Sequence, residues 1–158
     1  MSFQSPNKSL TKLVVCAMVS AALTGCASSQ KIADALLEEP IDFTNVFLRG
    51  SFSWWEADEK FRLNEIGNGE YAVSVELVAD GQPYDFKFAD ANYTPKYTCG
   101  FASQQMEVLN EGVEAEVSCN TAASVDNFKF TPISSGTYQF KLITSKWDNH
   151  KIVIIKQS

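Results

Sequence analysis

Two of the three tryptophans in the sequence, Trp54 and Trp55, are adjacent, within the stretch VFLRGSFSWWEADEKF at residues 46–61. Adjacent side chains of a β-strand point to opposite faces of the sheet. Strict alternation along this stretch places Trp54 inward with Phe52, and Trp55 outward. An outward indole offers a flat apolar ring to a ligand or partner. The alternative is that a turn after Ser53 breaks the alternation, so that Trp55 also packs inside.

Residues that could support catalysis are few. The sequence has no HExxH motif, no GxSxG motif and no glycine-rich phosphate loop. The single histidine, His150, lies in the loop-like stretch WDNHK and is interpreted as solvated or structural. The carboxylate pairs Glu56 with Asp58 and Glu38 with Glu39 could formally hydrolyse a glycoside, but they lie on turn and tether segments. We therefore predict a protein that is not an enzyme and needs no metal or cofactor.

The first 25 residues are predicted to be a secretory signal peptide. Lys8 and Lys12 give a basic start, and the apolar run that follows, residues 13–23, is too short to span a bilayer as a helix. The run ends in LTGC, which resembles the lipobox of bacterial lipoproteins, with Cys26 as the lipidated residue. The alternatives are a plain signal peptide with an incidental cysteine, or an uncut anchor.

The lipobox resemblance implies cleavage before Cys26 and a membrane anchor of acyl chains such as palmitate on that residue. Ala27, rather than an aspartate, follows the cysteine. By resemblance to enteric-type lipoproteins, this favours the outer membrane over the inner membrane. We predict a lipidated tether over residues 26–42 and one folded domain over residues 43–158. Within the tether, KIADALLEE could form one or two helical turns that Pro40 stops.

The charge of the chain is acidic, with a formal net charge of −6 at pH 7. Loss of the signal peptide removes Lys8 and Lys12 but no acidic residue, so the mature protein is more acidic still. Such a surface repels nucleic acid and anionic lipid headgroups, so neither is expected as a partner.

Two cysteines, Cys99 and Cys119, remain after Cys16 in the signal and Cys26 at the lipid site are set aside. In an oxidising envelope compartment, such a pair is most simply a disulfide. The functional alternative is a metal or redox site, but two distant cysteines and the one histidine do not make a zinc set.

The body of the chain shows a period of two, which predicts strands. Turn signals separate the runs, for example Gly67-Asn68-Gly69 and Asp80-Gly81. Seven or so short strands with almost no helical periodicity indicate an all-β sandwich with inward phenylalanines. The alternating runs are residues 46–55, 71–77, 84–88, 113–119, 128–130 and 138–142. The last run, KIVIIK at residues 151–156, is apolar on both faces, which is consistent with a more buried strand.

Three stretches together resemble the glycogen- and starch-binding module family, which includes the β-subunit of AMP-activated kinase. GSF at residues 50–52 with Trp55 is similar to its first element. ELVADGQPYDFKF, which contains Lys87, is similar to the second, and ADANYTP, which contains Tyr93, to the third. The resemblance implies an immunoglobulin-like β-sandwich of seven to nine antiparallel strands.

The resemblance also implies that Trp55, Lys87 and Tyr93 line a shallow groove for an α-glucan, with rings on the sugar faces and the lysine on the hydroxyls. The period of two independently turns Trp55 and Lys87 outward. The sequence departs from the family pattern at Ser53, where the family has asparagine, and at Tyr93, where it has tryptophan. Residues 98–120 have no counterpart in the pattern.

Two functions follow as hypotheses. The first is a non-catalytic outer-membrane lipoprotein that binds starch, glycogen or maltodextrin. The second is a structural or interaction lipoprotein whose exposed aromatics dock an amylolytic enzyme or another envelope protein. Trp147, in the loop before the last strand, could contribute to either surface.

Overall fold

The computed structural model describes residues 41–101, 108–119, 126–145 and 149–158. The predicted signal peptide, the lipid acceptor Cys26, nearly all of the predicted tether and Trp147 lie outside these residues. The described part contains short 3₁₀ turns η1, η2 and η3 and nine strands. The elements are β1 (Phe47–Gly50), η1 (Ser51–Ser53), η2 (Glu59–Phe61), β2 (Asn64–Gly67), β3 (Glu70–Leu77), β4 (Tyr84–Ala89), η3 (Pro95–Tyr97), β5 (Val108–Leu109), β6 (Ala115–Val117), β7 (Phe128–Phe130), β8 (Gly136–Ile143) and β9 (His150–Lys156).

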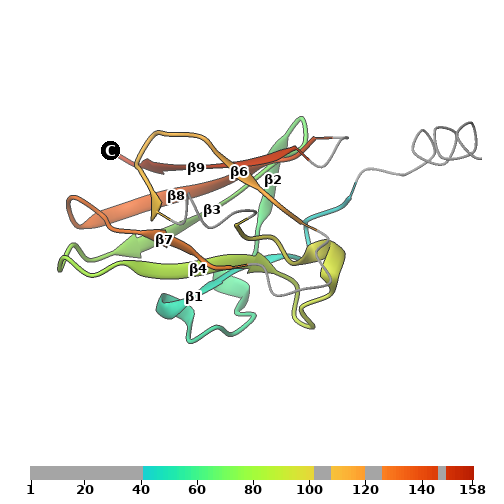
Figure 1. Ribbon diagram of the computed structural model, residues 1–158, viewed down its shortest axis with the longest axis horizontal. Helices are drawn as coiled ribbons and strands as arrows, with labels where there is room; N and C mark the ends of the chain where they lie inside the picture. The colour runs from blue at the N-terminus through green and yellow to red at the C-terminus, as the bar shows by residue number, and fades with distance from the viewer. Residues whose placement is uncertain (1–40, 102–107, 120–125, 146–148) are drawn as a thin grey trace, which may run out of the picture. The chain divides into compact units, whose positions relative to one another are not determined.

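The strands form two sheets that pack as a sandwich, which confirms the predicted all-β, immunoglobulin-like class. One sheet has the order β1-β4-β7-β5 and the other the order β2-β3-β8-β9-β6. Figure 1 shows β1, β4 and β7 in one layer and β3, β8 and β9 in the other. The pairs are antiparallel as predicted, except that β5 runs parallel to β7.

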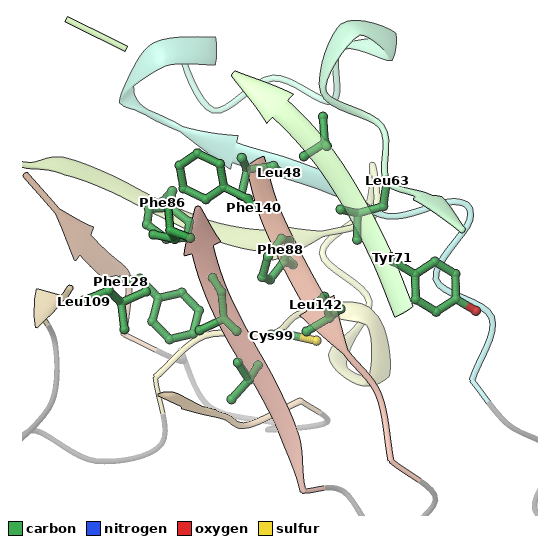
Figure 2. Packing of buried hydrophobic residues seen from close by; sticks show 14 of the residues in the cluster. Leu48, Leu63, Tyr71, Phe86, Phe88, Cys99, Leu109, Phe128, Phe140 and Leu142 are labelled. Carbon is green, nitrogen blue, oxygen red and sulfur yellow. The ribbon is translucent and has the colours of Figure 1, made fainter. Parts of the chain in front are cut away.

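The core between the sheets is built from the inward residues of the alternating strands. Figure 2 shows Phe86 and Phe88 of β4 beside Phe140 of β8, and the Phe86 and Phe140 rings meet edge to face at 5.0 Å between centroids. Phe128 lies 5.3 Å from Phe86 within the same sheet. Alternation along β4 and β8 therefore aims large rings at one another, and each buried ring contributes roughly 1.5–3 kcal/mol.

The last strand, β9, lies between β8 and β6, in keeping with the more buried position expected of its apolar sequence. Ile152, Val153 and Ile154 are all buried, whereas Ile155 is partly exposed. The expected strand over residues 113–119 is shorter in the structure, since β6 starts at Ala115 and Val113 is exposed.

The hairpin between β2 and β3 turns at the predicted Gly67-Asn68-Gly69. All three residues have positive φ, at 113°, 55° and 74°. Glycine and asparagine tolerate this region because the steric conflict of a larger side chain is absent or small there. The turn chemistry was thus readable from the sequence.

Candidate functional site

The strand that leads to the two tryptophans ends earlier than alternation predicted. β1 stops at Gly50, and a 3₁₀ turn follows over Ser51–Ser53. The Ser53 hydroxyl accepts a hydrogen bond from the Gly50 N–H and donates one to the Gly50 carbonyl, both at 3.1 Å. The Trp55 N–H then donates back to the Gly50 carbonyl at 3.0 Å. These bonds close a tight turn and remove both tryptophans from the strand.

The predicted orientation of Trp54 is therefore wrong. Trp54 is 87% exposed rather than inward, and Trp55 is half-buried. Phe52, also expected inward, is half-buried and packs against the core. Trp54 and Trp55 have φ values of 51° and 63°, so neither has the extended backbone on which strict alternation depends. The alternation is broken by a turn, as the alternative held, but the turn begins at Ser51 rather than after Ser53, and Trp55 is half-buried rather than packed inside.

Arg49 holds this turn in place and was missed by the sequence analysis. Its side chain is buried although it lies on the outer face of its sheet. Nε donates to the Trp55 carbonyl at 2.7 Å, and Nη2 donates to the same oxygen. Nη1 donates to the Asp90 carbonyl at 2.9 Å and, more weakly, to Ala91 at 3.4 Å. The one available signal was a lone arginine within the otherwise apolar run VFLRG.

The second loop held by Arg49 follows β4 and carries Tyr93. Asp90 orders this loop, since Oδ1 accepts from the Thr94 N–H and Oδ2 accepts from the Thr94 hydroxyl, both at 2.7 Å. Tyr93 has a φ of 55° and is 42% exposed. Its hydroxyl donates a long hydrogen bond to the Trp55 carbonyl at 3.4 Å. Two site residues that were predicted from separate stretches, Trp55 and Tyr93, thus meet at one carbonyl oxygen.

The guanidinium of Arg49 also stacks on Tyr93. Its central carbon lies 3.8 Å from the centre of the phenol ring. A cation over an aromatic face contributes about 0.5–2 kcal/mol, more where water is excluded. One face of the Tyr93 ring is thus covered by Arg49, and the rest of the side chain is partly exposed to solvent.

Lys87, the third predicted site residue, lies beside Arg49. The two residues are directly paired in the β1–β4 register, so their side chains share the outer face of the sheet. Lys87 is half-buried. Burial lowers the pKa of its ammonium group, and attraction to the Asp126 carboxylate partly opposes that change. The sheet register therefore places Lys87 next to the residue that holds Trp55 and Tyr93.

The surface formed by Trp55, Tyr93 and Lys87 is called the aromatic face below. It combines two partly exposed rings and an amine. Flat rings cover the C–H faces of a sugar, and an amine donates hydrogen bonds to hydroxyl oxygens. Among the described residues, no group of three or more histidine, cysteine or acidic side chains could hold a metal ion.

The other polar candidates have structural roles. His150 is 2% exposed, its Nδ1 accepts from the Ser145 N–H at 3.2 Å, and its ring packs 5.6 Å from Phe43. Asp58 caps η2 by accepting from the Lys60 N–H at 2.9 Å. His150 thus begins β9 as a buried residue rather than lying in the predicted loop, and both side chains make contacts within the fold.

The predicted disulfide between Cys99 and Cys119 is present, with a sulfur–sulfur distance of 2.05 Å. Cys99 continues the sheet by exchanging two backbone hydrogen bonds with Phe88 of β4, at 2.8 and 3.0 Å. Cys119 lies just after β6. The bond therefore links the two sheets across one end of the sandwich.

In the described part of the chain, no helix has the length and apolarity that crossing a membrane would require. The chain matches no protein-family model and no curated protein. Its fold is similar to a solved structure described as the ligand-induced structure of AmyP-SBD, a starch-binding domain. The similarity covers 98% of this chain and 100% of that one, with a TM-score of 0.53 and 17% sequence identity. At this identity the likeness is one of fold.

Proposed function

We propose that this protein binds α-glucan chains of the starch, glycogen or maltodextrin type without hydrolysing them, and that the aromatic face is the binding surface. The observation that carries the proposal is that Arg49 holds the Trp55 carbonyl and the Tyr93 ring together and is itself paired with Lys87 in the sheet. The likeness of the fold to a starch-binding domain supports it.

The affinity expected of such a face is modest. By analogy with the stacking of nucleic-acid bases, each aromatic ring contributes roughly 1–3 kcal/mol. Two rings and a few solvated hydrogen bonds then correspond to dissociation constants from micromolar to millimolar. The fixed backbone around Arg49 favours binding because the loops need not be ordered by the ligand.

The cellular setting is part of the proposal. Cleavage before Cys26 and acylation of that residue would attach the protein to the outer membrane, where the aromatic face would hold glucan near the cell surface or uptake machinery. A Cys26→Ala variant, partitioned between detergent and water phases, tests the anchor. Wild-type protein is expected in the detergent phase and the variant in the aqueous phase; recovery of both in the aqueous phase contradicts lipidation.

The binding function is tested by titrating the mature domain with maltoheptaose and by pull-down on insoluble amylose. Trp55→Ala and Tyr93→Ala should each weaken binding at least fivefold, since each removes a stacking ring. Val78→Ala is the matched control, because Val78 is exposed on the β3–β4 loop and outside the aromatic face. Absence of any binding by the wild-type protein contradicts the proposal.

A protein partner is the alternative that the same experiments can reveal. An exposed indole such as Trp54 also occurs at protein interfaces. In that case, a stoichiometric envelope protein should co-purify from detergent extracts of wild-type cells and be lost with Trp55→Ala, while glucan neither binds nor competes.

A further inference from the structure

Trp54 occupies a position that the fold gives no reason to fill with tryptophan. Its φ of 51° lies in the left-handed region, where bulky side chains are rare and glycine or asparagine is favoured. Its side chain is 87% exposed, so burial of the indole does not offset that cost. Both the backbone strain and the exposed apolar surface are unfavourable in the isolated domain, and a residue under such constraints points to a binding role.

The backbone on both sides of Trp54 is anchored. Before it, the Ser53 hydroxyl is bonded to both backbone groups of Gly50. After it, the Trp55 carbonyl accepts from Arg49 and from the Tyr93 hydroxyl. The Cα atoms of Trp54 and Trp55 are about 3.8 Å apart, as in any trans peptide. The backbone of Trp54 is therefore held in place next to Trp55, one of the predicted site residues.

The surroundings of Trp54 favour a sugar over a protein as its occupant. The nearby residues Ser51, Glu56 and Asp58 are exposed and polar. A stable protein interface needs a contiguous apolar centre of several hundred Å². An exposed flat ring with polar residues near it in sequence instead suits a ligand with an apolar face and a hydroxyl-rich edge, which is the form of a glucose residue.

We propose that Trp54 is an additional sugar-contacting residue, which stacks on a glucose unit beyond those held by Trp55 and Tyr93 and so selects longer α-glucan chains over short ones. This inference rests on the proposed function and deepens it. The resemblance to glucan-binding modules singled out Trp55, Lys87 and Tyr93 only, so the assignment comes from the structure. Since each ring covers one sugar unit, an outer ring adds affinity only when the chain extends far enough to reach it.

The test compares maltotriose with maltoheptaose by calorimetric titration of the wild-type domain and Trp54→Asn. Asparagine is chosen because it tolerates the left-handed backbone, so the variant should melt at the wild-type temperature or above. We expect Trp54→Asn to bind maltoheptaose about fivefold or more weakly, the equivalent of one weak ring contact, and maltotriose within twofold of wild type. Ile133→Ala is the control, because Ile133 is also 87% exposed but lies on the β7–β8 loop.

Each outcome separates the two proposals. If the wild-type domain binds maltoheptaose, Trp55→Ala weakens it and Trp54→Asn does not, the proposed function stands and the role of Trp54 is wrong. An equal loss for both sugars overturns the chain-length selection, because Trp54 would then act within the inner site. If the wild-type domain binds neither sugar, the proposed function fails and this inference fails with it. Loss of a co-purifying protein from Trp54→Asn, with glucan affinity unchanged, also overturns it.

Discussion

Arg49 and Tyr93 form a stacked pair, with the guanidinium carbon 3.8 Å from the centre of the phenol ring. Arg49 belongs to the first strand and Tyr93 to the loop after the fourth. The same guanidinium binds the carbonyls of Trp55 and Asp90. One buried side chain thus joins the two loops that carry the exposed rings, and the arrangement of the aromatic face depends on it.

We expect Arg49→Lys to weaken both the fold and the binding of glucan. A lysine keeps the charge but not the planar fork that reaches two carbonyls and covers a ring. Loss of buried hydrogen bonds should lower the free energy of unfolding by about 1–3 kcal/mol. Urea denaturation measures the first effect, and maltoheptaose titration below the unfolding transition measures the second, with at least a fivefold loss expected from misplaced rings.

Arg62→Lys is the matched control for Arg49→Lys. Arg62 also lies over an aromatic ring, with its guanidinium carbon 4.8 Å from the centre of Phe47, but it is paired with Glu59 outside the aromatic face. Its replacement should leave glucan affinity unchanged. Equal affinities for wild type and Arg49→Lys would show that Arg49 does not position the rings.

Gly50→Ala should disrupt the turn that presents the tryptophans. The backbone of Gly50 is extended, with φ of −171°, so the conflict is one of space. An added Cβ would lie 2.6 Å from the Asp85 carbonyl oxygen and 2.8 Å from the Phe86 Cβ. Forcing β1 and β4 apart should cost about 1–3 kcal/mol of unfolding free energy and shift tryptophan fluorescence. Ser51→Ala, at an exposed neighbour, should do neither; unchanged stability of Gly50→Ala would contradict the close approach.

The pKa of Lys87 in the folded protein should be lower than that of an ordinary lysine. Burial lowers the pKa of Lys87 from its usual 10.5, and Asp126 only partly offsets this. The unfolded chain then holds the proton more tightly than the folded one, so the stability contribution of Lys87 is fully present above 10.5 and is lost as the pH falls through the folded pKa. NMR titration of the lysine side-chain carbons measures the shift directly.

The lowered pKa of Lys87 should also change how the free energy of unfolding depends on pH. The unfolding free energy of wild type, measured relative to Lys87→Met, should rise as the pH increases from the folded pKa of Lys87 to 10.5. Over that range the affinity for maltoheptaose should fall in the wild type alone, because the neutral amine makes weaker hydrogen bonds to the sugar. A pH-independent difference between the two proteins would contradict the lowered pKa.

Reduction of the Cys99–Cys119 disulfide should destabilise the domain. The two cysteines are 20 residues apart in sequence, and a closed loop of this size is worth roughly 3 kcal/mol in the chain-entropy model. The double variant Cys99→Ser with Cys119→Ser should melt lower than wild type by thermal denaturation, and added reductant should lower only the wild-type melting temperature. Equal melting temperatures for the two proteins under oxidising conditions would contradict this stabilising role.

The sequence by itself was sufficient to predict the all-β sandwich, the hairpin turn at Gly67-Asn68-Gly69 and the disulfide. Alternation reports which face of a strand is buried, so Phe86, Phe88 and Phe140 could be assigned inward from residues near them in sequence. The pairing of Cys99 with Cys119 followed from the expected compartment and from elimination of the other two cysteines. These inferences need only local pattern or composition.

The geometry of the aromatic face was decided by tertiary structure alone. Alternation failed at Trp54 because β1 ends at Gly50, where the Ser53 hydroxyl and the Trp55 N–H bond to the Gly50 backbone and close a turn. Arg49 had no visible role until the Trp55 and Asp90 carbonyls were brought to it from two different loops. Periodicity describes a regular backbone, so it does not report where a turn interrupts a strand, and the role of a buried cation depends on partners that other segments of the chain bring to it.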